Sequence, residues 1–172
     1  EKHQYVNQMF SRIAHRYDLM NRIMTAGQDH RWRKLLIRQA NLPPQGSLLD
    51  IATGTGDIAF EALRHHADLS RVVGADFTLP MMHVGQQRAR KNRLSVNWSG
   101  ADTLHLPFPD NTFDAVASGF LMRNVTNVAQ ALAEQRRVCK PGGRVLILEI
   151  PRPADNLFGA MFRLYFHRVV PL

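Results

Sequence analysis

Short apolar segments alternate with amphipathic stretches from about residue 47 to residue 150. The apolar segments are rich in Val, Ile and Leu and predict strands, whereas the stretches between them have the spacing of helices. The expected strands are Ser47–Ile51, Arg71–Asp76, Ser95–Ser99, Asp114–Ser118 and Arg144–Ile150. The expected helices are Asp57–His66, Pro80–Arg93 and Asn127–Cys139. Strands alternating with helices predict right-handed βαβ units, and therefore an α/β fold with a parallel sheet flanked by helices.

The first 40 residues have a different pattern, with apolar residues near helical spacing and no strand signal. The segment Asn41–Gly46 then breaks the helix, because proline cannot continue it and glycine permits a sharp turn. We expect an N-terminal helical cap over residues 1–45 and a core over residues 46–172. The apolar cap positions are Met9, Ile13, Tyr17, Met20, Ile23, Met24, Trp32, Leu35, Leu36 and Ile37.

The last predicted element, residues 156–170, is helix-like and dense in aromatic residues. It ends at Pro171-Leu172 without returning to the sheet, so we expect either a truncated fold or another covering for that sheet edge. With the methionines of the cap, these aromatics suggest walls for a lipid chain. Met and aromatic stripes at helical spacing are, however, more often ordinary core.

Composition narrows the class of protein. The 172 residues, 45% of them apolar, fit one globular domain, and no apolar run approaches the length of a membrane span. A single cysteine, Cys139, excludes an internal disulfide and a cysteine-clustered zinc site, and no other metal site is expected. These features, with no secretory pattern, predict a cytoplasmic location. The net charge of +8 suits nucleic acid, an anionic membrane surface or simply a basic soluble surface.

A glycine loop follows the first predicted strand. Gly54 and Gly56 let a ligand approach the backbone, and Ala59 completes the pattern G-x-G-x-x-[GA] before a helix. Asp76 ends the next predicted strand, 20 residues beyond Gly56, where a carboxylate can accept hydrogen bonds from ribose hydroxyls. The pattern predicts a site for an adenosine-containing ligand and permits both NAD and S-adenosylmethionine.

Charge favours S-adenosylmethionine. A pyrophosphate requires a helix start without a nearby anion, yet Asp57 occupies that start and Asp50 the strand end. A helix N-cap explains Asp57 equally well, whereas a buried charge at Asp50 would need a partner. Asp102, after the third predicted strand, could accept a hydrogen bond from the adenine amine, although a loop-initiating role alone would explain it. Acids at three successive strand ends suit a cationic adenosyl ligand.

Several motifs resemble those of one family. Residues 17–21 read Tyr-Asp-Leu-Met-Asn, and residues 25–32 run from Thr to Trp. Residues 137–143 read Arg-Val-Cys-Lys-Pro-Gly-Gly and are followed by Glu149. Together with residues 106–110, 113–114 and 122–126, they make nearly the whole chain similar to the ubiquinone/menaquinone-biosynthesis C-methyltransferases. The resemblance implies a Rossmann-like class I fold that uses S-adenosylmethionine and releases S-adenosylhomocysteine.

The sequence also departs from that family. Thr25 replaces a serine, Asp29 stands where many members have histidine, Cys139 replaces a leucine, and Pro151 stands where Ser or Thr is preferred. The family continues beyond the position of Pro171, so we expect about two C-terminal strands to be absent from this sequence. The quinone side of the pocket is the part that this affects most.

The loop pattern and the resemblance together give the expected ligand contacts. The expected cofactor-binding residues are Asp50, Gly54, Thr55, Gly56, Asp76, Phe77, Asp102, Thr103, Ser118 and Gly119.

Carbon methylation of a quinol requires the ring as a phenolate, which a nearby cation stabilises. Arg123, just beyond the fourth predicted strand, is the expected cation, with a structural salt bridge as the alternative. Tyr17, Asp18, Asn21 and His30 of the cap could close over the substrate or relay its proton, and packing roles explain each of them equally well.

The expected function is therefore C-methylation of demethylmenaquinol or a ubiquinol precursor. Its partners would be a lipophilic quinol and, transiently, a membrane surface, with room for a homodimer and no need of nucleic acid. Three alternatives stay open. The first is a methyltransferase of RNA, protein or another small molecule, and the net charge and the basic run 88–93 favour RNA or protein. The second is an NAD-linked oxidoreductase, and the third is a fragment that binds the cofactor without turnover. Against methylation of RNA base amines, this sequence lacks the Asn/Asp-Pro-Pro-aromatic run that such enzymes commonly have after the fourth strand.

Overall fold

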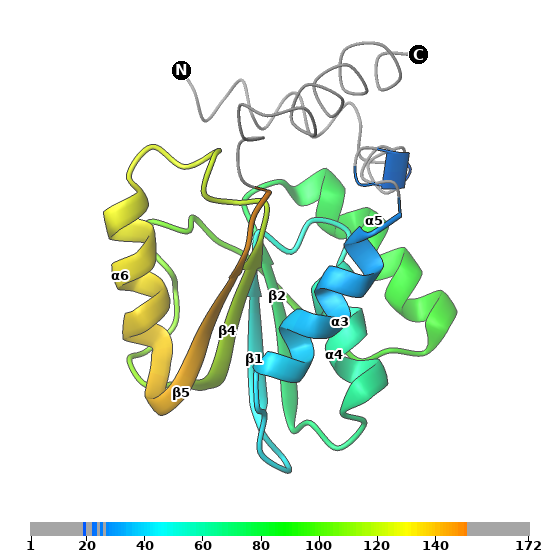
Figure 1. Cartoon of the computed structure of the whole chain (residues 1–172), viewed down its shortest axis with the longest axis horizontal. Helices are drawn as coiled ribbons and strands as arrows, with labels where there is room; N and C mark the ends of the chain where they lie inside the picture. The colour runs from blue at the N-terminus through cyan, green and yellow to red at the C-terminus, as the bar shows by residue number, and fades with distance from the viewer. Residues whose placement is uncertain (1–18, 20–21, 24, 26, 151–172) are drawn as a thin grey trace, which may run out of the picture.

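A single parallel sheet forms the centre of the chain in a computed structural model that describes residues 19, 22–23, 25 and 27–150. The five strands lie in the order β3-β2-β1-β4-β5, and every neighbouring pair is parallel. Figure 1 labels β2, β1, β4 and β5 of this sheet. They are β1 (Ser47–Ile51), β2 (Arg71–Asp76), β3 (Asn97–Gly100), β4 (Phe113–Gly119) and β5 (Cys139–Leu148). This order places the reversal of the chain between β1 and β4, where open parallel sheets bind ligands at the carboxyl ends of their strands.

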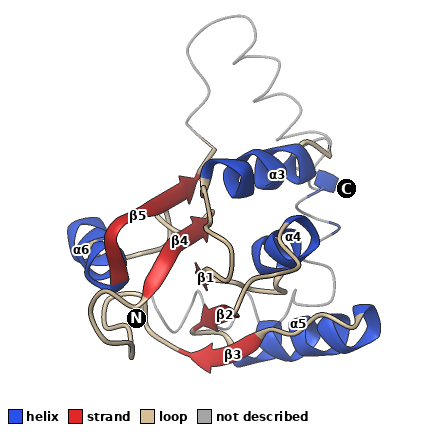
Figure 2. Ribbon diagram, turned by 90° about the horizontal axis from the view of Figure 1, so that it is seen from below, coloured by secondary structure: helices blue, strands red, loops and turns tan. Residues whose placement is uncertain are grey.

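Helices cover both faces of the sheet. Helices α3, α4 and α5 lie on one face and α6 on the other (Figure 2). Their bounds are α3 (Asp29–Gln39), α4 (Asp57–His65), α5 (Leu79–Asn92) and α6 (Val128–Val138). Helices on both faces of a parallel sheet confirm the predicted α/β fold.

Each face of the sheet has its own apolar core, because successive side chains of a strand point to opposite faces. Leu48 of β1 packs with Ile37 of α3 and Ile58 of α4 on one face, and Leu49 packs with Val138 of α6 on the other. Strands buried on both faces read as nearly continuous apolar runs, which explains why the sequence identifies β1 and β2 with the observed bounds.

Among the strands, β5 has the largest difference between the predicted bounds, Arg144–Ile150, and the observed bounds. The strand begins at Cys139 and not at Arg144, because the chain passes from α6 into extended structure without a loop. Phe113 pairs with Cys139 but Ala115 pairs with Arg144, so residues 140–143 bulge opposite Asp114. Proline and glycines within this bulge break the apolar pattern from which the strand was predicted.

Helix α3, which belongs to the cap predicted from the sequence, packs onto the core. Its buried residues Leu36 and Ile37, and Ala40 at its C-cap, join the same cluster as Leu48 of β1. The division of the chain at residue 45/46 stays a prediction, and the predicted helical segments over residues 1–18 and 156–170 lie outside the described residues. Among the described helices, none has the length and apolar character of a membrane span.

Gly85 allows α5 to approach the glycine loop closely. A Cβ atom at this position would lie 2.5 Å from Cη2 of Trp98 and 3.1 Å from the carbonyl carbon of Thr55. Alanine normally stabilises a helix by about 1 kcal/mol relative to glycine. Here overpacking outweighs that gain, and we expect Gly85→Ala to lower the free energy of unfolding by about 1–2 kcal/mol.

Urea unfolding of Gly85→Ala measures this loss, with Gln87→Ala on the exposed side of the same helix as the matched control. An unfolding midpoint for Gly85→Ala equal to or above that of the wild type would contradict the close packing of α5 on the loop.

Candidate functional site

The carboxylate of Asp76 fastens the glycine loop to the end of β2. Its Oδ2 accepts a hydrogen bond of 2.7 Å from the Gly54 backbone N–H, and its Oδ1 accepts one of 2.6 Å from that of Thr78. Gly54 has a φ of 56°, a left-handed conformation that glycine adopts without strain. Burial raises the pKa of Asp76 and outweighs these bonds. The loop and the start of α5 are thus fixed around one buried acid.

Asp50 is the second buried acid of the site. Its side chain is 1% exposed, and its Oδ2 accepts hydrogen bonds from the Thr53 hydroxyl at 2.6 Å and the Ala59 backbone N–H at 3.1 Å. Within the described part of the chain, its Oδ1 has no hydrogen-bond partner. Burial, reinforced by the charges of Asp76 and Asp57, raises the pKa of Asp50 to about 7. The partner that a buried charge at Asp50 needs is therefore supplied by two hydrogen-bond donors, and burial reduces the charge.

A largely apolar cavity opens beside Asp76 at the carboxyl edge of the sheet. The space between its walls is about 840 Å³, and this figure includes the part that is open to solvent. Apolar walls come from β1, β2 and the segments after β3 and β4, including Ile51, Leu106 and Leu121. The predicted residues that line this cavity are Gly54, Asp76, Phe77, Asp102, Thr103 and Gly119.

A smaller, more polar cavity adjoins the first on the other side of the loop. It encloses about 350 Å³ counted in the same way and shares Ala52, Gly54, Gly119 and Phe120 with the apolar cavity. The predicted residues Asp50 and Thr55 line it, together with Arg33 and Asp57. The two cavities therefore adjoin at the loop, and one has mainly apolar walls whereas the other has charged residues in its walls.

The segment after β3 supplies two further polar groups. Oδ1 of Asp102 accepts a 2.9 Å hydrogen bond from the Leu104 backbone N–H, which is the loop-initiating role considered above. Oγ1 of Thr103 is buried and lacks a hydrogen-bond partner among the described residues. A ligand in the apolar cavity could satisfy this hydroxyl.

Two of the predicted ligand contacts, Gly56 and Ser118, are not among the residues that line the two cavities, and their contact with a ligand stays a prediction. Gly56 has a φ of 92°, and a Cβ atom there would lie 2.8 Å from Cζ of Phe60 and 2.9 Å from Cη2 of Trp98. Packing within the protein therefore requires the glycine at this position. Ser118 is fully buried in β4.

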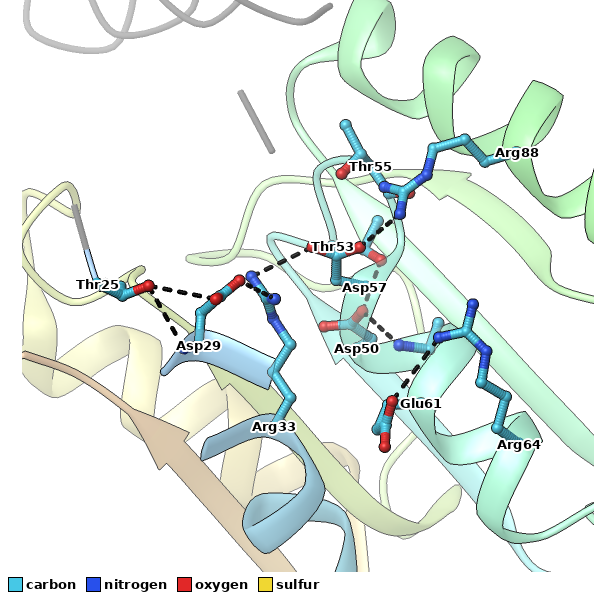
Figure 3. Close-up of polar contacts among 11 residues, drawn as sticks. Thr25, Asp29, Arg33, Asp50, Thr53, Thr55, Asp57, Glu61, Arg64 and Arg88 are labelled. Carbon is cyan, nitrogen blue, oxygen red and sulfur yellow. Dashed lines mark hydrogen bonds and ion pairs between the residues drawn. The ribbon is translucent and has the colours of Figure 1, made fainter. Parts of the chain in front are cut away.

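An ion-pair chain crosses the loop from α3 to α5 (Figure 3). Asp57 lies 3.2 Å from Nη2 of Arg33 and accepts a 2.8 Å hydrogen bond from Nη2 of Arg88. Arg88 also donates to the Thr55 carbonyl at 3.1 Å. Burial opposes ionisation of Asp57, but the two guanidinium groups prevail and lower its pKa. The N-cap alternative for Asp57 is wrong, since Gly56 is the N-cap residue and the Asp57 carboxylate binds arginines.

The predicted catalytic residues are only partly described. Arg123 lines neither cavity; its Nη1 lies 4.0 Å from Oε2 of Glu149, and its guanidinium stands 5.2 Å from the ring centroid of Phe120, which lines both cavities. Tyr17, Asp18 and Asn21 lie outside the described residues. His30 is exposed on α3.

The sequence prediction missed four polar residues of the site. Thr53 and Thr78 hold the two buried acids, while Asn124 and Arg33 line the cavities. For Arg33 the one available signal was its i,i+4 spacing from Asp29 on a helix. The described residues contain no group of three or more His, Cys, Asp or Glu side chains that could hold a metal ion.

The model of the ubiE/COQ5 methyltransferase family matches residues 1–172. The demethylmenaquinone methyltransferase of Deinococcus radiodurans is 46% identical over 171 residues, which cover 99% of this chain and 70% of that protein. The ubiquinone/menaquinone biosynthesis C-methyltransferase UbiE of Desulfotalea psychrophila is 45% identical, over 97% of this chain and 67% of that protein.

Solved structures share the fold. YcgJ of Bacillus subtilis is 28% identical with a TM-score of 0.67, over 73% of this chain and about half (53%) of that chain. A structure described as a putative S-adenosyl-L-methionine-dependent methyltransferase, from Methanococcus maripaludis, has a TM-score of 0.69 at 23% identity, over 80% of this chain and 62% of that chain. The latter likeness concerns the fold alone.

The raised pKa of Asp50 predicts a specific pH dependence of stability. Between the ordinary value of 3.8 and about 7 the folded state holds a proton that the unfolded state has released. The free energy of unfolding therefore falls as the pH rises through this window and is flat above it. Asp50→Asn cannot titrate and lacks this contribution.

Urea unfolding of the wild type and of Asp50→Asn at several pH values between 3.8 and about 7 gives the difference between their free energies of unfolding. Contributions of other acids that are the same in both proteins cancel in this difference. We expect the wild type to lose stability relative to the variant as the pH rises. A difference that does not change with pH would mean that Asp50 is ionised throughout.

Proposed function

Because this chain belongs to the ubiE/COQ5 methyltransferase family, we propose that it transfers the methyl group of S-adenosylmethionine to a ring carbon of a prenylated quinol. The support for the acceptor comes from relatives that are named for demethylmenaquinone and for ubiquinone/menaquinone biosynthesis. The chain spans about 70% of the first of these relatives and 67% of the second. Demethylmenaquinol and a ubiquinol precursor are both compatible acceptors.

The observation that carries the proposal is the pair of adjoining cavities, one lined by the buried acid Asp76 and the other by the buried acid Asp50. Adenosine suits the apolar cavity, where Asp76 could accept from ribose hydroxyls and Asp102 from the adenine amine. The unpartnered Oδ1 of Asp50 and Oγ1 of Thr103 are atoms that a polar ligand would satisfy. Asp50 presents an acceptor oxygen without a donor partner beside the start of α4, where a pyrophosphate would need hydrogen-bond donors, which is why an NAD-linked function is the weaker alternative.

S-adenosylmethionine, when bound, supplies an electrophilic methyl group on a sulfonium sulfur. The contribution of the chain is chiefly to orient the reactants and to exclude water, which can account for much of the rate of such a transfer. Asp76 and the loop it holds would fix the adenosyl end, and the apolar walls would exclude water. These roles need no acid or base beside the methyl group.

The acceptor ring must be electron-rich, and a phenolate is the form that attacks through carbon. The ring carbon that gains the methyl group then loses its proton, so that the ring becomes aromatic again. A cation beside the phenolate oxygen lowers its pKa. Arg123 is the cation we assign to this role, because its contact with Glu149 is a loose 4.0 Å and its side chain is 44% exposed beside Phe120. Tyr17, Asp18 and Asn21 are proposed to close over the ring.

A prenylated quinol is a membrane lipid, so the proposal includes transient contact of a cytoplasmic protein with the membrane surface. The exposed side of α3 suits an anionic surface, since Arg31, Lys34 and Arg38 are exposed there and Asp29, the only acid of the helix, is buried.

Incubation with labelled S-adenosylmethionine and a panel of demethylated benzoquinols and naphthoquinols tests the function. We expect a mass gain of one methylene unit on a ring carbon, found by mass spectrometry of the product. Transfer to RNA, to protein or to an unrelated small molecule, with no quinol methylated, would contradict the proposal.

Arg123→Ala tests the assignment of the cation. We expect kcat for the quinol to fall about 100-fold, as for loss of one group that stabilises developing charge, with unchanged affinity for S-adenosylhomocysteine. Arg136→Ala, an exposed arginine of α6, is the matched control. Activity of Arg123→Ala equal to that of the control would remove Arg123 from the mechanism.

A further inference from the structure

The smaller cavity contains a buried cation that the expected ligand contacts do not include. Arg33 comes from α3, is 5% exposed and lines this cavity together with Asp50 and Asp57 (Figure 3). Burying an arginine costs free energy unless the guanidinium is paired with an acid. The contacts of the Arg33 guanidinium therefore show which of its N–H donors a ligand could still use.

The guanidinium is held in place from two sides. Its Nη1 donates a 2.6 Å hydrogen bond to Oδ2 of Asp29, which is 2% exposed, and the Thr25 hydroxyl donates to the other oxygen of Asp29 at 3.2 Å. Its Nη2 lies 3.2 Å from Oδ2 of Asp57. A guanidinium has five N–H donors, so these contacts fix its orientation and leave it able to accept a further anionic partner.

The charged side chains in and beside this cavity form one ion-paired group, from which Asp50 is separate. Arg33 and Arg88 balance Asp29 and Asp57, since Asp57 bridges both arginines. Asp50 stands apart from this group, and its buried Oδ1 has no hydrogen-bond partner among the described residues. The cavity thus offers a cation and, separately, a hydrogen-bond acceptor. An α-amino acid group, with a carboxylate and an ammonium on one carbon, has the matching charges.

We propose that Arg33 binds the carboxylate of the amino-acid end of the methyl donor, with the ammonium facing Oδ1 of Asp50. This inference rests on the proposed function and adds to it a binding residue from outside the glycine loop. Arg33 lies on α3, so the amino-acid end would join this helix to the loop that holds the adenosyl end. Asp29 and Asp57 act as positioning residues for the guanidinium.

The alternative is that Arg33 is purely structural and only anchors α3 beside α4. Two ligands separate the possibilities: S-adenosylhomocysteine carries the amino-acid end, whereas methylthioadenosine retains the adenosine and the sulfur but lacks that end. A binding residue for the carboxylate affects the first ligand alone, and a structural residue affects both.

The test variant is Arg33→Met combined with Asp29→Asn, because Arg33→Met alone would leave a buried carboxylate without its partner. Calorimetry with the folded variant should give a Kd for S-adenosylhomocysteine about 10- to 100-fold weaker than that of the wild type, as for loss of a charge-assisted hydrogen bond. The Kd for methylthioadenosine should be unchanged within about threefold.

Arg88→Met is the matched control. Arg88 is the other arginine bound to Asp57, and Arg88 itself lines neither cavity. Any loss that Arg88→Met causes should be the same for both ligands.

Equal losses for both ligands in the Arg33→Met/Asp29→Asn variant would overturn the assignment in favour of a structural role, and so would the absence of any loss. If the wild type binds neither ligand, the proposed function itself fails, and the inference fails with it. A variant that does not fold, while Asp29→Asn folds, would identify Arg33 as a structural residue and also overturn the proposal.

Discussion

The hydrogen bond between the Gly54 N–H and the buried Asp76 carboxylate is the contact on which the site depends. It joins the end of β2 to the loop after β1, and the parallel register of these two strands places both groups at one edge of the sheet. The other oxygen of Asp76 receives the Thr78 N–H at the start of α5. One acid therefore fixes the shape of the apolar cavity, and the same position suits it to meet the hydroxyls of a bound ribose.

The second organising feature is the chain of charges on the α3 side of the loop. Asp57 holds arginines from α3 and α5, and Arg88 also binds the Thr55 carbonyl, so three helices are fixed to the loop that separates the two cavities. Ion pairs buried to this degree contribute little net stability, because desolvation offsets their attraction. Their effect is to orient the groups, and the groups they orient surround the smaller cavity.

The sequence predicts the scaffold better than the site. Strands buried on both faces have an unmistakable apolar pattern, so β1 and β2 are predicted with their observed bounds, whereas the bulge at residues 140–143 hides the start of β5. Asp76 and Gly54 follow from the order of strand, loop and helix. The role of Gly56 could not be predicted, because it depends on the packing of Phe60 and Trp98, and Trp98 is distant in the sequence. Arg33 was missed for the same reason: its partner Asp57 lies on another helix, and helical periodicity does not reveal pairs between elements.

We propose that the two adjoining cavities receive a positively charged adenosyl donor and not a pyrophosphate nucleotide. Calorimetric titration of the chain with S-adenosylhomocysteine and, separately, with NADH tests it most directly. We expect saturable binding of S-adenosylhomocysteine at one site per chain and no measurable heat of binding for NADH. Binding of NADH without binding of S-adenosylhomocysteine would contradict it.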